Sequence, residues 1–260
     1  MRLTFLGTGT SHGVPMIACT CATCTSPDPR NHRRRSSLLV EWRETVIVID
    51  TGPEFRLQAI DARLRRVDAI LLTHAHSDHV MGLDDVRAFN LRGGAPVRVH
   101  GSAATLAEVR HRFAYAFQPG DEGGGKPKID LQEIDGPFTV GDLELTPFDV
   151  MHGSTVVTAF RIAPSGGGAA VAYVTDTNAI PEASFASLCD LDLLILDALG
   201  PWRHPTHFSL EEAVDVARRA GAPRTLFTHV SHGLEHAATN ATLPAGMALA
   251  FDRQVVHVGG

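Results

Sequence analysis

The stretch "AILLTHAHSDHVMG", residues 69–82, joins a short apolar run to a dense group of metal-ligating side chains. The apolar run is typical of a β-strand buried on both faces. Four side chains that commonly bind metals follow it: His74, His76, Asp78 and His79. One small tetrahedral ion with an open position uses three protein ligands, so four within six residues favour a division between two metal ions. A single histidine would more simply be a structural residue without a metal, but this cluster of four side chains is better explained by metal binding.

Several later apolar runs also end on a side chain that can bind a metal. The runs "FDVMH", "VAYVTD" and "LFTH" end at His152, Asp176 and His229. Loops at strand ends can gather ligands at one edge of a sheet, so these three side chains are candidates to complete two metal sites. The chain contains 14 histidines, and a metal centre accounts for part of that excess.

Amphipathic segments alternate with the apolar runs. Helices are expected within three segments: residues 53–67, 102–117 and 209–223. Ser102 is a candidate N-cap, and Ser209 stands in capping-box spacing with Glu212. In the first helix, a buried stripe is expected from Phe55, Ile60, Leu64 and Val67. This alternation of strands and helices predicts a layered α/β architecture.

Two glycine-rich stretches interrupt the pattern. Residues 118–128 are expected to form a loop, and residues 164–168 a hairpin connection between two strands. Neither is flanked by a shift in composition, so we expect a single domain over residues 1–260.

Charge and composition exclude several classes of protein. The net charge is −6 and the isoelectric point about 6.1, which argues against broad electrostatic binding to nucleic acid. No apolar run reaches the length that spans a bilayer, and the N-terminus lacks a secretion signal, so we expect no membrane partner and a cytoplasmic location. The basic stretch 32–37 is either a solvated loop or an anchor for a phosphate. The sequence leaves a homodimer open.

Three of the four cysteines lie within six positions. Cys19, Cys21 and Cys24 are one ligand short of a closed tetrahedral zinc site, and a Cys19–Cys24 disulfide or a redox pair is the alternative. Cys189 stands in an apolar run and is expected to be a small core residue.

The ligand pattern resembles that of the metallo-β-lactamase superfamily. The H-x-H-x-D-H motif at residues 74–79, the later His152, the strand-end Asp176 and the T-H at residues 228–229 carry the resemblance. It implies a four-layer αββα sandwich with a dinuclear metal site at one edge. By position, one metal would take His74, His76 and His152, the other Asp78, His79 and His229, with Asp176 as the bridge.

Further motifs resemble the phosphodiesterase family of the carbon–phosphorus lyase pathway. They are "GTGTSHGVP" with the C-x-C-x-x-C loop, "AYVTDTNAIPE", "HFSLEEA" and "LPAGMALAFD". That family opens the ring of phosphoribosyl 1,2-cyclic phosphate, so the resemblance implies a metal-dependent phosphodiesterase acting on a small cyclic phosphodiester in phosphonate breakdown.

Two other functions stay open. One is an activity like that of the transfer RNA 3′-end endonuclease. Ser77 stands where that family usually has Gly, and no long arm is inserted, so nucleic acid is not the expected partner. The other is hydrolysis of a carbonyl ester or thioester on the same fold.

The resemblance also implies roles around the metals. His207 matches the catalytic histidine of the family, with Asp78 as the catalytic metal ligand; a histidine at a helix start without chemistry is the alternative. His204 is a weaker candidate for the same catalytic role, as the acid that assists the leaving group, or for substrate binding. Asp50 and Asp197 are expected to accept hydrogen bonds from metal-bound imidazoles.

The remaining expectations concern the substrate and the metals. Arg34 and Arg35 are candidates to hold a second phosphate of the substrate. His and Asp ligands suit two catalytic zinc or manganese ions. The resemblance assigns one further, structural zinc to four ligands: Cys19, Cys21, Cys24 and His232.

Overall fold

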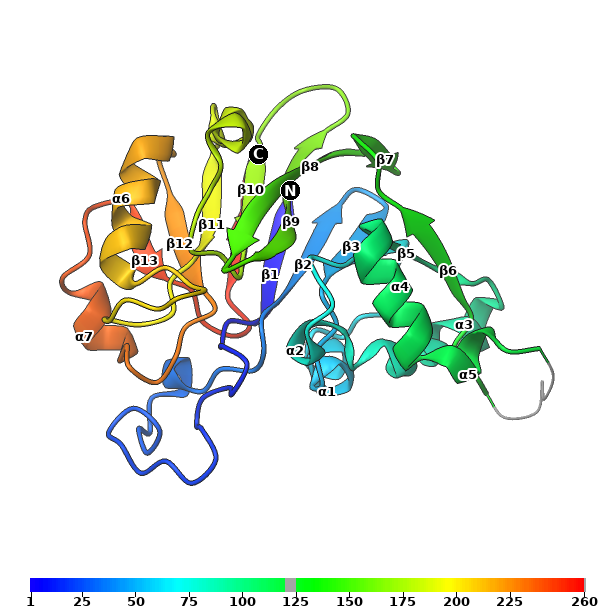
Figure 1. Ribbon diagram of the computed structural model, residues 1–260, viewed down its shortest axis with the longest axis horizontal. Helices are drawn as coiled ribbons and strands as arrows, with labels where there is room; N and C mark the ends of the chain where they lie inside the picture. The colour runs from blue at the N-terminus through cyan, green and yellow to red at the C-terminus, as the bar shows by residue number, and fades with distance from the viewer. Residues whose placement is uncertain (120–124, 260) are drawn as a thin grey trace.

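Two mixed β-sheets packed face to face form the centre of the molecule in the computed structural model (Figure 1). The structure describes residues 1–119 and 125–259, apart from the side chains of residues 92 and 93. The first sheet has the order β14-β1-β2-β3-β4-β5-β6. Its strands are β1 (Arg2–Gly7), β2 (Ser37–Trp42), β3 (Thr45–Ile49), β4 (Ala69–Leu71), β5 (Val97–Gly101), β6 (Ile129–Glu133) and β14 (Val255–His257).

The second sheet comes from the other half of the chain and has the order β13-β12-β11-β10-β9-β8-β7. Its strands are β7 (Phe138–Val140), β8 (Leu143–His152), β9 (Thr155–Pro164), β10 (Val171–Val174), β11 (Leu193–Asp197), β12 (Thr225–Thr228) and β13 (Met247–Leu249). In both sheets one half is antiparallel and the other parallel: β3 to β6 pair in parallel, and so do β10 to β13. The carboxyl ends of parallel strands share one edge of a sheet, which is where ligands collect in such folds.

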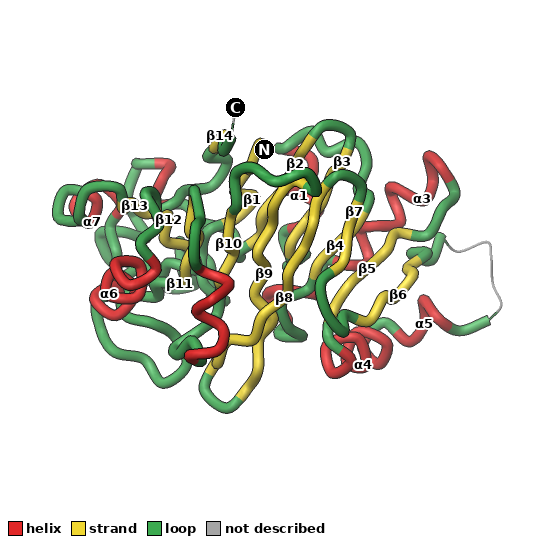
Figure 2. The backbone as a smooth tube through the Cα atoms, turned by 90° about the horizontal axis from the view of Figure 1, so that it is seen from above, coloured by secondary structure: helices red, strands yellow, loops and turns green. Residues whose placement is uncertain are grey.

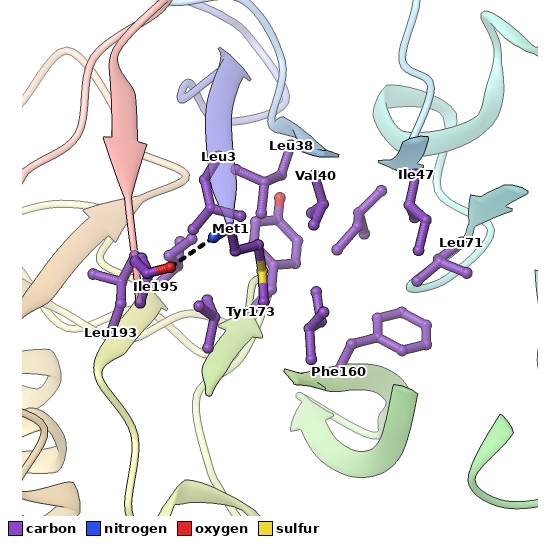
Figure 3. Close-up of a cluster of buried hydrophobic side chains, with 14 of the residues drawn as sticks. Met1, Leu3, Leu38, Val40, Ile47, Leu71, Phe160, Tyr173, Leu193 and Ile195 are labelled. Carbon is purple, nitrogen blue, oxygen red and sulfur yellow. Dashed lines mark hydrogen bonds between the residues drawn. The ribbon is translucent and has the colours of Figure 1, made fainter. Parts of the chain in front are cut away.

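The interface between the sheets is apolar and fully buried (Figure 3). Side chains from the inner faces of both sheets fill it, among them Leu3, Leu38, Val40, Ile47, Leu71, Phe160, Tyr173, Leu193 and Ile195. The amino group of Met1 donates a hydrogen bond of 2.7 Å to the Val258 carbonyl, so the two ends of the chain meet beside this core.

Helices cover the outer face of each sheet (Figure 2). The first sheet is covered by α1 (Phe55–Asp61), the 3-10 helix η2 (Leu83–Val86), α3 (Arg87–Gly93), α4 (Ala103–Arg112) and α5 (Ala114–Phe117). The second is covered by η4 (Glu182–Leu188) and α6 (Leu210–Ala220), and α7 (His236–Asn240) lies against its edge strand β13. Two short helices lie in loops: η1 (Pro29–Asn31) and α2 (Ser77–Val80). The expected four-layer αββα sandwich is therefore confirmed.

Helices are present in all three expected segments, but not all of them have the expected length. Ser102 caps α4 and Ser209 caps α6, where Glu212 completes a capping box. The segment 102–117 breaks at Phe113 into two helices. The expected stripe along residues 53–67 is only partly present. Phe55 is buried and Leu64 and Val67 pack against the same apolar cluster, but α1 ends at Asp61 and Ile60 is 57% exposed.

Two further expectations can be compared with the structure. Residues 164–168 do connect the antiparallel neighbours β9 and β10. Cys189 is exposed, because Leu188 takes the buried position at the end of η4; its assignment to the core was wrong. The loop expected at residues 118–128 lies partly outside the described residues. Within the described ranges, every helix is too short or too polar to cross a bilayer.

The capping box of α6 provides a test of the local structure. In Ser209→Ala, the Glu212 amide loses its acceptor and the Glu212 carboxylate loses the hydroxyl that donates to it. We expect the free energy of unfolding to fall by about 1 kcal/mol, measured by urea denaturation. Ser165→Ala, at an exposed turn position, is the matched control and should change it little. An equal effect of both substitutions would contradict this role of the cap.

Candidate metal centre

The predicted ligands come from four separate strand ends, at the edge marked by α2 in the lower middle of Figure 1. His74 follows β4 by three residues, and the chain then turns into α2, which carries Asp78 and His79. The other ligands end or follow strands of the second sheet: His152, Asp176 and His229. The sandwich therefore brings together side chains that are more than 150 positions apart in the sequence.

Backbone conformation marks the same strand ends. Asp50, Asp176 and His229 each follow a strand, with φ values of 61°, 53° and 57°. Residues other than glycine rarely adopt this left-handed conformation, although Asp and His do so more readily than most. Such backbone strain persists where the surrounding structure holds a functional side chain in place, and here it occurs at three of the residues that build the site.

Asp176 occupies the middle of the group. Its Oδ2 lies 3.2 Å from His79 Nε2, and its Oδ1 lies 3.2 Å from His229 Nε2. The Nε2 atom of His74 is 3.9 Å from Asp176 Oδ1. A carboxylate that faces three imidazole rings through both oxygens is placed as a bridging ligand would be.

The ring nitrogens and carboxylate oxygens of the seven predicted metal ligands form two neighbouring groups. Within each group these atoms lie within 4.8 Å of one another. One group contains His74, His76 and His152. The other contains Asp78, His79, Asp176 and His229. This division matches the split expected from the sequence, with Asp176 in reach of both groups.

Unpaired atoms test whether these residues fit metal ions. In the described part of the chain, His74 Nε2, His79 Nε2 and both ring nitrogens of His229 are buried and have no hydrogen-bond partner. Buried polar atoms are normally paired, so such a concentration needs an explanation. Divalent metals bound by Nε2 nitrogens and carboxylate oxygens would satisfy the three Nε2 atoms, and the donor set therefore fits them. The other nitrogen of His229, Nδ1, lies 3.9 Å from Asp197 Oδ1.

The electrostatics of the group are strongly perturbed. Burial lowers the pKa of His79, but Asp176, Asp50 and Asp78 outweigh it and hold that pKa well above its ordinary value. Burial likewise opposes a raised pKa at His229, yet Asp176 and Asp78 raise it to about 9. The imidazoles in turn hold the pKa of Asp176 well below its usual range despite complete burial. Shifts of this kind in one cluster are typical of a functional site.

Hydrogen bonds at the far side of three rings decide which nitrogen faces the centre. His79 Nδ1 donates to Asp50 Oδ2 at 2.7 Å, and His152 Nδ1 donates to the Thr206 carbonyl at 2.8 Å. His74 Nδ1 lies 3.0 Å from the Thr73 hydroxyl, which itself donates to Asp50. Each Nδ1 therefore carries the proton, and each Nε2 is left as the nitrogen that can bind a metal.

His207 lies against the metal ligands. It is buried, and its ring centroid is 4.6 Å from those of both His152 and His229. Its Nδ1 donates to Asp197 Oδ2 at 2.7 Å. Asp197 was expected to orient a metal-bound imidazole; instead its hydrogen bond goes to His207, because the loop before α6 brings that ring closer than His229, whose Nδ1 is 3.9 Å from Asp197.

The candidate substrate-binding residues are placed differently from one another. His204 lies beside His207, with ring centroids 5.3 Å apart. Arg34 pairs with Asp61 at 2.8 Å, and Arg35 pairs with Glu54. The described contacts place His204 next to the centre, whereas both guanidinium groups are engaged with carboxylates.

The cysteine cluster forms a second, separate group. The Nδ1 atom of His232 lies 3.2, 3.4 and 3.6 Å from the sulfurs of Cys19, Cys21 and Cys24. All three cysteines are free thiols rather than a disulfide. The amides of Met16 and Cys24 point at two of the sulfurs. Four ligands without an open position suit a structural zinc ion.

The cysteine loop is attached to the strand end that carries His229. Thr10 N donates to the Val230 carbonyl, and Val230 N donates to the Thr8 carbonyl. His232 is two residues beyond this pairing, so the loop and the metal centre share one short segment.

Threonines are the part of the site that the sequence reasoning missed. Thr73 connects Asp50 to His74, and the Thr175 hydroxyl donates to Asp176 Oδ2 at 2.7 Å. A repeated pattern could have revealed them, because a buried threonine stands directly before a ligand at or just after three strand ends: Thr73–His74, Thr175–Asp176 and Thr228–His229.

The two groups of ligands predict separable metal losses. Purified protein should contain about three metal ions per chain, because two catalytic ions and one closed structural site are expected. In Asp78→Ala the catalytic metals should be depleted while the cysteine-bound ion stays. In Cys21→Ser about one ion should be lost and the other two retained, as measured by elemental analysis with circular dichroism as the control for folding. Loss of the same ions from both variants would refute the two-site assignment.

Known proteins with similar sequence and structure support this description. The family model described as the beta-lactamase superfamily domain matches residues 45–230. A structure described as a new diphosphatase from the PhnP family is 39% identical, with a TM-score of 0.90 over 98% of this chain and 97% of that chain. Ribonuclease Z of Mycolicibacterium paratuberculosis is 28% identical over 82% of this chain and 86% of that protein.

One relative is much longer than this chain. The octanoyltransferase of Porphyromonas gingivalis is 36% identical over 89% of this chain, which corresponds to 46% of that protein. This chain therefore spans less than half of that relative. By the matched family model and by its similarity to the diphosphatase structure over nearly the full length of both chains, this chain belongs to the beta-lactamase superfamily and, within it, to the PhnP family.

Proposed function

We propose that this protein is a metal-dependent phosphodiesterase that acts on a small phosphodiester. The position of Asp176 between three imidazoles, with His207 beside them, is the observation that carries the proposal. Membership of the PhnP family and the similarity to ribonuclease Z support the enzyme class. Two divalent metals, zinc or manganese, at these ligands would activate a water molecule and neutralise charge on the phosphate.

His207 is proposed as the general acid. Its Nδ1 is engaged with Asp197, which leaves Nε2 for the centre. A ring nitrogen of His207 lies within 4.8 Å of a ring nitrogen of His152 and of a carboxylate oxygen of Asp176. A protonated Nε2 could pass its proton to the departing sugar oxygen, which is otherwise a poor leaving group. Asp197 holds the ring in this orientation and balances its charge while the proton is present.

The substrate is proposed as phosphoribosyl 1,2-cyclic phosphate, opened to a ribose phosphate monoester as in phosphonate breakdown. Cleavage of a diphosphate linkage is the second candidate, because the relative that is 39% identical is described as a diphosphatase. Both reactions use the same ligands and the same attack at phosphorus. The name octanoyltransferase belongs to a protein more than twice the length of the matched segment, so it is not transferred to this chain.

His207→Ala should separate the acid from the metal centre. We expect the turnover number on a cyclic ribose phosphate to fall by about 10²- to 10⁴-fold, the usual contribution of a general acid, with metal content unchanged. An aryl phosphodiester has a good leaving group that needs little protonation, so its hydrolysis should fall much less. Equal losses on both substrates would contradict the role as acid.

A substrate panel tests the proposed function directly. The metal-loaded protein should be compared on ribose 1,2-cyclic phosphates, a 2′,3′-cyclic nucleotide, a dinucleoside diphosphate, a thioester and precursor transfer RNA. We expect the highest kcat/KM on a small cyclic phosphodiester. Turnover of the thioester alone would overturn the phosphodiesterase assignment, and preference for the RNA would transfer it to an endonuclease.

A further inference from the structure

The loop between β11 and α6, residues 198–209, stands beside the metal centre and is held at both ends. The Thr206 carbonyl accepts the hydrogen bond from His152, and the Thr206 methyl packs against Gly153. Trp202 packs so closely on Gly233 that a Cβ atom there would lie 2.5 Å from its ring. The exposed residues between these two anchors are therefore held next to the centre.

His204 is the residue of this exposed segment that faces the catalytic side chains. Its ring lies 5.3 Å from the His207 ring at an angle of 44°. His207, Asp197 and His229 all act electrostatically on it. Its neighbour Arg203 turns away, with a side chain that is 90% exposed and 3.4 Å from Glu212.

The hydrogen bonds of His204 decide where its proton sits. The Thr206 amide lies 3.4 Å and the Thr206 hydroxyl 3.2 Å from His204 Nδ1. A backbone amide can only donate, so Nδ1 accepts and the neutral ring carries its hydrogen on Nε2. Partial burial and the nearby His207 lower the pKa of His204, which favours the neutral ring. Among the described residues, none accepts a hydrogen bond from Nε2.

We propose that His204 is a specificity-determining residue that donates its Nε2–H to a second, non-reacting phosphate of the substrate. This inference rests on the proposed function, since it concerns the substrate of the same site. A donor next to the acid, with no acceptor among the described residues, is suited to an anionic oxygen. Hydrogen bonds to charged groups are stronger than those between neutral groups. The arginines that the sequence suggested for this task, Arg34 and Arg35, are already paired with Asp61 and Glu54.

Binding of a matched pair of ligands tests the proposal without turnover. Ribose 1,5-bisphosphate and ribose 1-phosphate differ by one phosphate, and their dissociation constants for the metal-loaded protein can be measured by calorimetry. We expect wild-type protein to prefer the bisphosphate and His204→Ala to reduce that preference by about 10- to 100-fold. His204→Gln keeps an N–H donor and should keep most of the preference. Arg203→Gln is the matched control on the same loop and should leave it unchanged.

Two further readouts separate a substrate contact from a structural role. Nitrogen-15 spectra of the zinc-loaded protein should show His204 with its hydrogen on Nε2, and Thr206→Val should weaken that tautomer. In kinetics on a cyclic ribose bearing a second phosphate, His204→Ala should raise KM by about 10- to 100-fold and change kcat little, unlike His207→Ala.

Three results would overturn the proposal: no preference for the bisphosphate in the wild type, equal loss of both ligands in His204→Ala, or a hydrogen on Nδ1 of His204. Failure of the proposed function looks different, because no phosphodiester in the panel would then be hydrolysed. Hydrolysis with an unchanged preference in His204→Ala would sink this inference alone.

Discussion

The carboxylate of Asp176 is completely buried, and the arrangement around it follows from that fact. Burying an ionised carboxylate costs several kcal/mol unless opposite charge and hydrogen bonds compensate for it. Here the compensation comes from His74, His79 and His229, which reach it from both sheets. The need to bring these rings to one point explains why strand ends from two separate halves of the chain converge at one edge, and why the backbone there adopts conformations that are costly elsewhere.

A second layer of hydrogen bonds gives these rings their direction. Asp50 and the Thr206 carbonyl hold the outer nitrogens of His79 and His152, so that the inner nitrogens face the centre. Asp197 does the same for His207. The same chemical device, a fixed acceptor behind an imidazole, thus serves both the candidate metal ligands and the candidate acid, and the difference between the two roles comes from what each Nε2 faces.

The cysteine cluster lies outside the metal centre but contacts the segment that follows the ligand His229. The loop of residues 16–28 has little regular structure of its own, and its three cysteines meet His232 from the other end of the chain. Polar contacts join the same region to the C-terminal segment. Asn31 bonds to Glu235 and to the amide of His236, and Asp252 accepts hydrogen bonds from the amides of Thr8 and Arg34. The segment between His229 and His232 is therefore held by contacts on both sides.

Much of the fold and of the ligand set could be predicted from the sequence, because strand ends and ligand spacing are local properties. The apolar runs before His74, Asp176 and His229 are strands, and the division into two groups of ligands follows from the crowding of residues 74–79. The extent of α1, the exposure of Cys189 and the pairing of Arg34 and Arg35 could not be predicted, since each depends on neighbours distant in the sequence. The hydrogen bond between Asp197 and His207 could not be predicted either, nor could the position of His204 beside His207. Both depend on how one loop crosses the edge of the second sheet. The sequence by itself thus determined which side chains are available for chemistry, whereas only the tertiary structure decided which nitrogen each ring presents, because that choice is made by hydrogen bonds between segments that meet only in the folded chain.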